Sequence, residues 1–262
     1  MCARSLAGKA GMPRVLFAFA VMFAVYQASE GLQTVIAPSS AIGPALMAVA
    51  LLLAWPLGRW LGWRGYDAFG LDLHPRSLAL LGSGMILAAL AFLASRSMGA
   101  AIGAYGPSPA QDISVTLLMV GAALLTTFVP SVAEDILTRG FLLKAWPVCR
   151  SGWIYVPVTA LLYTANHIWR LDWGISEQVR LFCLGLVYGA AAWRWRSLWA
   201  AVALHWGWNL SNVLVDQWIP TDTLQIDAAR YVSAGVNVAM LAIILLVPKL
   251  GYRGGPDEHI RS

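Results

Sequence analysis

Charged residues are scarce in this sequence, which excludes an ordinary soluble domain. Asp, Glu, Lys and Arg make up 12% of the 262 residues, whereas soluble globular domains carry about 25%. A chain with so few charges cannot cover a surface that faces water on all sides. Hydrophobic residues make up 59% of the sequence, so the composition predicts an integral membrane protein.

Cysteine is also rare, and the cysteines are far apart. The three are Cys2, Cys149 and Cys183, with no CxxC pair among them. Neither a disulfide framework nor a thiolate metal site is therefore indicated. The net charge of +5 follows from membrane topology, since cytoplasmic loops are enriched in Lys and Arg. We predict a lipid bilayer around the chain and no nucleic-acid partner.

In place of charge, the sequence has long hydrophobic runs. A helix needs about 20 mainly apolar residues to span a bilayer, and eight runs approach this length. We therefore predict an all-α fold, a polytopic transmembrane bundle of about eight spanning helices in a single integral membrane domain (residues 1–262). The predicted spans are Val15–Gly31, Ala41–Leu57, Ser77–Ala94, Ser114–Trp146, Trp153–Trp169, Gln178–Arg194, Leu198–Val215 and Tyr231–Leu250.

The segments between the runs contain residues that break helices or favour membrane surfaces. We expect Gly58–Pro75 to be an interfacial connector, with Trp60 and Trp63 near the lipid headgroups. We expect Tyr105–Pro109 to be a loop, because its glycine and prolines break helices. A basic stretch precedes the first run, as in a signal peptide. No clear small-x-small cleavage site follows, so we expect this helix to be retained.

The basic residues are distributed unevenly between the two sides of such a bundle. With the N-terminus in the cytoplasm and alternating spans, most of the 18 basic residues lie on the cytoplasmic side. This bias predicts a multi-pass protein with both termini cytoplasmic. The excess of Arg over Lys points to a bacterial genome, hence to a bacterial inner (cytoplasmic) membrane. The basic residues predicted on the opposite side are Arg96, Arg170, Arg180 and Arg230.

A few polar and ionisable residues interrupt the predicted spans. They are Glu134 and Asp135 in the fourth span, His167 in the fifth, and His205 and Asn209 in the seventh. Such groups are costly inside a membrane, and by default they indicate function. At 1.5 Å per residue, their heights above the cytoplasmic helix ends range from about 10 to about 21 Å. We therefore expect them to meet in one polar cavity.

Helical spacing divides these residues further. His205 and Asn209 are four residues apart, so they lie on one face of their helix. Asp135 and Arg139 are also four apart and can form an ion pair, which leaves Glu134 for another role. Each residue also has a structural interpretation: ion pairs at a helix end for the acids, an interfacial position for His167, and interhelical hydrogen bonding for Asn209.

Together these motifs resemble the CPBP family, the CAAX proteases and bacteriocin-processing enzymes also called the Abi family. That family is marked by E-E-x-x-x-R, then F-x-x-x-H, then H-x-x-x-N. The motifs here lie within a predicted catalytic core of about residues 114–215. They read Glu134-Asp135-Ile136-Leu137-Thr138-Arg139, Tyr163-Thr164-Ala165-Asn166-His167 and His205-Trp206-Gly207-Trp208-Asn209.

Two positions depart from the family pattern. Asp135 replaces the second glutamate and keeps its charge on a shorter side chain, and Tyr163 replaces the phenylalanine but keeps an aromatic ring. The first glutamate, which the resemblance implies is catalytic, is present as Glu134. The shorter Asp135 puts only the supporting role of the second acid in doubt.

The resemblance implies a glutamate-dependent intramembrane endopeptidase that cleaves a membrane-associated peptide or protein. Glu134 would then activate water, His167 would position it, and His205 and Asn209 would donate hydrogen bonds to the oxyanion. Asp135 and Arg139 would support the helix. We favour no metal. The alternative is a zinc site with Glu134, His167 and His205 as ligands, although no H-E-x-x-H helix is present.

Two alternatives outside proteolysis remain at this stage. One is a membrane scaffold or chaperone that keeps the family fold without activity. The other is a transporter or proton channel, for which no inverted repeat is found in the sequence. The substrate of a protease also stays open between a prenylated CAAX tail, a bacteriocin leader and a C-terminal sorting signal.

Overall fold

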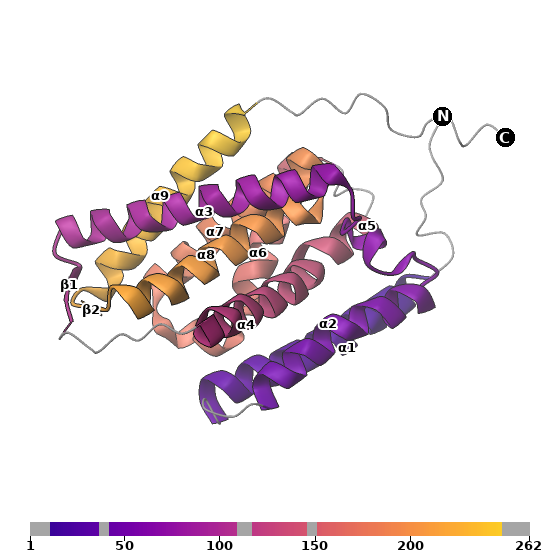
Figure 1. The fold of residues 1–262 in the computed structure, drawn as a ribbon. Helices are drawn as coiled ribbons and strands as arrows, with labels where there is room; N and C mark the ends of the chain where they lie inside the picture. Colours follow the sequence, from indigo (N-terminus) through magenta and orange to yellow (C-terminus); the bar gives the residue numbers. More distant parts are fainter. Residues whose placement is uncertain (1–10, 37–41, 109–116, 146–150, 248–262) are drawn as a thin grey trace.

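The computed structural model describes residues 11–36, 42–108, 117–145 and 151–247, which form a bundle of helices with one short pair of strands (Figure 1). The long helices run roughly along a common direction, and α1 and α2 form a hairpin on one side. The elements are α1 Met12–Gly31, η2 Leu32–Ile36, α2 Ile42–Trp60, η3 Gly65–Phe69, α3 Pro75–Ala101, β1 Tyr105–Pro107, α4 Leu117–Asp135, η4 Ile136–Gly140, α5 Phe141–Ala145, α6 Gly152–Asn166, η6 Ile168–Trp173, α7 Ile175–Trp195, α8 Leu198–Trp218, β2 Thr221–Thr223 and α9 Ile226–Leu246.

The all-α prediction is confirmed, and the chain is an integral, multi-pass membrane protein. Five helices among the described residues are long and apolar enough to cross a bilayer: Met12–Ile36, Ile42–Trp60, Pro75–Ala101, Leu117–Ala145 and Ile226–Leu246. The other three predicted spans are also helical, as α6, α7 and α8. However, α6 has only 15 residues, and α7 and α8 carry the polar groups described below. The count of eight spans stays a prediction.

Small residues allow the helices at the centre of the bundle to approach closely. A Cβ on Gly207 of α8 would lie 2.9 Å from Met85 Cα on α3, and one on Gly185 of α7 would lie 2.7 Å from Ala160 Cα on α6. Larger side chains would force these pairs apart. Helices in membranes associate largely through such close packing, which fixes α8 and α6 around the polar residues that they carry.

Within the fourth predicted span, the described residues Leu117–Ala145 form one continuous helical segment whose geometry changes in the middle; the predicted ends at Ser114 and Trp146 lie outside the described residues. It begins as α4, widens into the π-helical turn η4 directly after Asp135, and continues as α5. A π-helical turn adds a residue to the turn and often lies at a functional site. Here it follows the two acidic residues, Glu134 and Asp135, which end α4.

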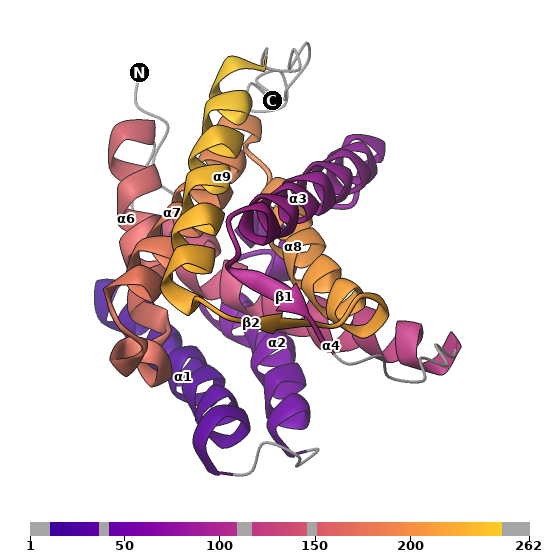
Figure 2. The ribbon, with the colours of Figure 1, turned by 90° about the vertical axis from the view of Figure 1, so that its left-hand side faces the viewer.

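Three local expectations were wrong in detail. Trp63 does not face headgroups: it is buried against the rings of Phe69 and Phe141. Tyr105–Pro107 is not a simple loop, because it pairs as an antiparallel strand with β2. Seen along the bundle, this strand pair lies across one end (Figure 2).

The third correction concerns the fifth span, which ends earlier than predicted. Helix α6 stops at Asn166, and His167 is its C-terminal cap residue. The His167 ring nitrogen Nδ1 bonds the carbonyl of Tyr163 at 2.8 Å, and such a bond satisfies a carbonyl left open at a helix C-terminus. The chain then continues as the 3-10 helix η6.

Candidate active site

The candidate site is centred on Glu134, a carboxylate buried inside the bundle. Glu134 is 3% exposed, and its neighbour Asp135 is fully buried. Both stand at the end of α4, before the π-helical turn. A buried carboxylate requires hydrogen-bonding or charged partners, and the partners of Glu134 come from two other helices.

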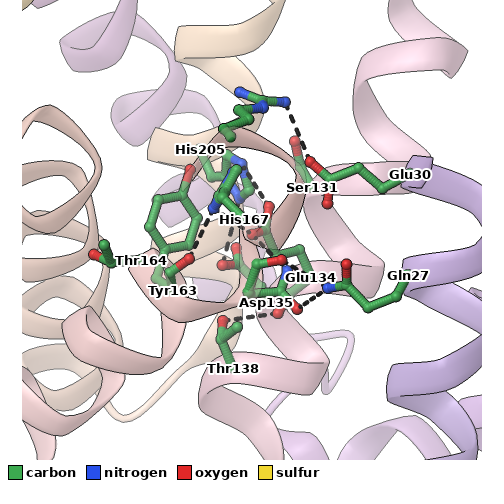
Figure 3. A network of polar contacts seen from close by, with 12 residues as sticks. Gln27, Glu30, Ser131, Glu134, Asp135, Thr138, Tyr163, Thr164, His167 and His205 are labelled. Carbon is green, nitrogen blue, oxygen red and sulfur yellow. Dashed lines mark hydrogen bonds and ion pairs between the residues drawn. The ribbon is translucent and has the colours of Figure 1, made fainter. Parts of the chain in front are cut away.

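Both predicted histidines lie against Glu134. Nδ1 of His167 is 3.7 Å from Oε1 of Glu134, and Nε2 of His205 is 3.5 Å from Oε2. Figure 3 shows the three side chains gathered between their helices. Since α4, α6 and α8 are separate in sequence, only the fold brings these residues together.

The contacts of His167 indicate which of its ring nitrogens carries a proton. A backbone carbonyl can only accept, so the bond between Nδ1 and Tyr163 O requires a proton on Nδ1. In the neutral ring the other nitrogen, Nε2, is then an acceptor. His167 is thus able to accept a hydrogen bond from a water molecule beside Glu134.

His205 lies between the two carboxylates. Its Nε2 faces Glu134, and its Nδ1 is 3.5 Å from Oδ1 of Asp135. The ring of Tyr188 stacks on the imidazole with centroids 4.9 Å apart, and Tyr163 meets its edge at 5.6 Å. Two aromatic rings and two acids therefore fix the orientation of this histidine.

The Asp135–Arg139 ion pair predicted from the spacing is present. Nη1 of Arg139 donates to Oδ1 of Asp135 and also to Oγ1 of Thr138 at 3.0 Å. Arg139 is fully buried, and its guanidinium lies 4.8 Å from the ring centroid of Tyr163 and 5.2 Å from that of Tyr188. Arg139 is therefore held by an acid and by the faces of two aromatic rings. These contacts link η4 to α6 and α7.

Asn209 lies one helical turn from His205 and does not contact Glu134 directly. Its amide nitrogen donates to Oγ of Ser131 at 3.2 Å, and Ser131 is one turn before Glu134 on α4. An amide has a second N–H to offer. Asn209 also lines a cavity of about 510 Å³, so this N–H is near a space that a ligand can enter.

Two residues of the site were not predicted: Asn166 and Gln27. The Asn166 amide nitrogen donates to Oε1 of Glu134 at 3.0 Å, and Gln27 Nε2 on α1 donates to Oδ1 of Asn166 at 2.9 Å and to its backbone carbonyl at 2.7 Å. The sequence contained a signal for this contribution from α1. Gln27 and Glu30 are polar residues in an apolar span, which by default indicates function.

The alternative zinc site would need a lone pair from each of Glu134, His167 and His205. Nδ1 of His167 donates to a carbonyl, so only its Nε2 could offer a lone pair to a metal. Among the described residues, no group of three His, Cys, Asp or Glu side chains is arranged to hold a metal ion.

Comparison with known proteins supports the resemblance seen in the motifs. Residues 116–211 match the family model described as type II CAAX prenyl endopeptidase Rce1-like. A search of the curated proteins found no match to the chain. The matched residues include Glu134, His167, His205 and Asn209, so the segment that carries the three motifs is similar to the CAAX protease (CPBP) family.

Proposed function

We propose that this protein is an intramembrane endopeptidase that hydrolyses a peptide bond of a membrane-associated protein or peptide, with Glu134 as general base. The observation that carries the proposal is the convergence of Glu134, His167 and His205, at 3.5–3.7 Å, inside the bundle. The family is one of peptide hydrolases, and such hydrolysis needs a base for water and donors for an oxyanion.

In the proposed reaction, Glu134 takes a proton from a water molecule that also donates to Nε2 of His167. The water oxygen bonds the peptide carbonyl carbon, whose oxygen becomes negatively charged. His205 and Asn209 donate hydrogen bonds to this oxygen. When the carbon–nitrogen bond breaks, Glu134 returns its proton to the leaving nitrogen, so the products are a carboxyl group and an amine.

Asp135 and Arg139 have a positioning role in this proposal. Their ion pair is buried, and Asp135 faces His205 while Arg139 packs on Tyr163 and Tyr188. The pair thereby fixes the relation of α4 to the histidine on α8. Removing it should move the oxyanion donor away from Glu134 without removing a group that touches substrate.

The second candidate function is that of a membrane scaffold or chaperone that uses the same fold without catalysis. A protease creates new chain termini, and a scaffold does not. We therefore expect cells that produce the wild-type protein to contain membrane-protein N-termini that are absent with Glu134→Gln. Mass spectrometry of enriched N-terminal peptides measures this difference. The cleaved sequences would also choose between a prenylated CAAX tail, a bacteriocin leader and a sorting signal.

A matched control for this experiment is Asp72→Asn, which makes a comparable change in an exposed carboxylate outside the site. It should leave the set of termini unchanged. Identical termini in wild type and Glu134→Gln, with both proteins present at equal levels, would support the scaffold.

Asn166 offers a separate test of how Glu134 is positioned. Asn166→Asp keeps the size of the side chain and the acceptor for Gln27, but it replaces the donor to Glu134 with an acceptor. Hydrogen bonds to charged groups are worth about 1.5–3 kcal/mol. We expect kcat for a substrate identified above to fall about 10- to 100-fold, with little change in KM.

The control for Asn166→Asp is Thr164→Val on the same helix. The Thr164 hydroxyl bonds only the carbonyl of Ala160 among the contacts described for it, one turn back on α6, so its loss should leave kcat near wild type. Thermal unfolding of each variant shows whether the fold is intact. A folded Asn166→Asp protein with wild-type kcat would mean that Asn166 does not position Glu134.

A further inference from the structure

Two arginines contact one buried carboxylate at one end of the bundle, and a third shares a tryptophan ring with one of them; we call Arg170, Arg180 and Arg230 the arginine cluster. Arg180 Nε lies 2.9 Å and Arg230 Nε 3.0 Å from Oε2 of Glu177, which is 1% exposed. The guanidiniums of Arg170 and Arg230 lie 5.3 and 5.7 Å from the ring centroid of Trp173. The cluster thus combines η6, α7 and α9.

The arginine cluster lines the cavity that Asn209 also lines. The four basic residues that the sequence places opposite the cytoplasm all lie on its wall, since Arg96 joins the cluster there. The acids on the wall are Glu30 and Glu177. Figure 2 looks onto this end of the molecule, where the strand pair lies across the ends of α3, α8 and α9.

The wall of the cavity carries four arginines and two glutamates, and two more acids contact its arginines: Asp216 lies 2.9 Å from Arg96 and Asp227 lies 3.9 Å from Arg230. Glu177 is shared by Arg180 and Arg230, and the contact of Arg170 with Glu30 is long, at 3.4 Å. Nε of Arg170 is buried and has no hydrogen-bond partner among the described residues. Buried charges are normally paired. The unpartnered Arg170 donor therefore fits an anion, and planar guanidinium groups match carboxylates especially well.

Other residues on the wall indicate that the anion belongs to a peptide. Thr127, Asn212 and Ser233 also line the cavity, and such side chains can bond the N–H and C=O groups of a peptide backbone. The acyl chains of a phospholipid would gain nothing from them. Asn209 lines this cavity and lies one helical turn from His205, so the cavity lies beside the candidate site.

We propose that the arginine cluster is a substrate subsite that binds a carboxylate of the peptide, from an acidic side chain or a free C-terminus. This deepens the proposed function and rests on it. The cluster fixes one end of the substrate, and the polar wall guides the chain toward Asn209 and Glu134. Substrates that have no carboxylate able to reach the arginine cluster bind more weakly.

The test is peptide binding to full-length Glu134→Gln in phosphatidylcholine nanodiscs, where no cleavage occurs under the proposed mechanism. The first probe is a capped peptide of alternating alanine and aspartate with a neutral fluorophore. The second replaces aspartate by asparagine, and the third is the second with a free C-terminal carboxylate. Anisotropy should show at least one carboxylate probe binding about tenfold or more tightly than the neutral probe.

Arg230→Gln should abolish this preference in the same background. Its matched control is Arg194→Gln, which changes an arginine at the other end of α7, away from the cavity. If Arg230→Gln fails to fold by thermal unfolding, Arg230→Lys keeps the charge while losing the planar fork, and it should weaken the preference. The proposal would be overturned if all three probes bound with equal affinity. It would also be overturned if Arg194→Gln reduced the preference for the carboxylate probes as much as Arg230→Gln does.

Anionic lipid is the remaining occupant to test. If phosphatidylglycerol in the nanodiscs is enriched around the protein in an Arg230-dependent way, while the probes are not distinguished, the cluster binds lipid and the proposal is wrong. Failure of the proposed function would look different. It would show as no cleavage by the wild type, whatever the probes do in the inactive variant.

Discussion

Glu134→Gln should lower the rate of substrate cleavage by about 10²–10⁴-fold, the usual cost of losing a general base. Glutamine keeps the shape of the side chain and can still bond Asn166, but it cannot take a proton from water at neutral pH. The substitution also removes a buried charge without opening a cavity. We therefore expect the variant to fold and to unfold at a temperature close to that of the wild type.

The measurement is single-turnover cleavage by purified wild-type and Glu134→Gln proteins in the same lipid. A parallel reaction with a metal chelator should leave the wild-type rate unchanged, because no group of three His, Cys, Asp or Glu side chains among the described residues is arranged to hold a metal ion. If Glu134 had only a structural role, the variant would lose stability and keep its rate per folded molecule. A folded variant that cleaves at the wild-type rate would show that Glu134 is not the general base.

Much of the fold could be predicted because membrane helices depend on local sequence. An apolar run of sufficient length forms a helix wherever it lies, since no water is present to bond an open backbone. The same locality explains the Asp135–Arg139 pair, which needs only a spacing of four residues. His205 and Glu134 could be expected to meet because each interrupts an apolar helix at a similar depth.

The parts that could not be predicted depend on contacts between distant segments. Gln27 reaches Asn166 across 139 positions, and no local pattern says which helix α1 will face. The end of α6 at Asn166 depends on the side-chain bond of His167 rather than on helix propensity. The π-helical turn after Asp135 has no signature in the sequence that we can identify.

The arginine cluster was also outside sequence reasoning. Arg170, Arg180 and Arg230 lie near the ends of helices, where basic residues usually face water or lipid headgroups. Their assignment to the side opposite the cytoplasm does not indicate that all three line the same cavity. Only the packing of η6, α7 and α9 turns three surface-like arginines into the wall of one cavity.

Arg139→Ala should be among the most destabilising substitutions in the protein. It would leave Asp135 fully buried with its charge unpaired, and breaking a buried ion pair in this way costs about 3–5 kcal/mol. The packing of the guanidinium on Tyr163 and Tyr188 would be lost as well. The free energy of unfolding, from reversible denaturation in mixed micelles, measures the loss.

The double variant Asp135→Asn, Arg139→Met separates the ion pair from simple packing. It removes both charges and keeps most of the volume, and neutral replacements of buried ion pairs are often tolerated. We expect it to be more stable than Arg139→Ala, although its activity should stay low because His205 loses the carboxylate that faces Nδ1.

The control is Arg59→Ala, which removes an exposed arginine that also lies over a ring, that of Trp55. That change should alter the free energy of unfolding by no more than about 0.5 kcal/mol. If Arg139→Ala were equally mild, or the double variant no more stable than the single one, the ion pair would not be what holds η4 in place.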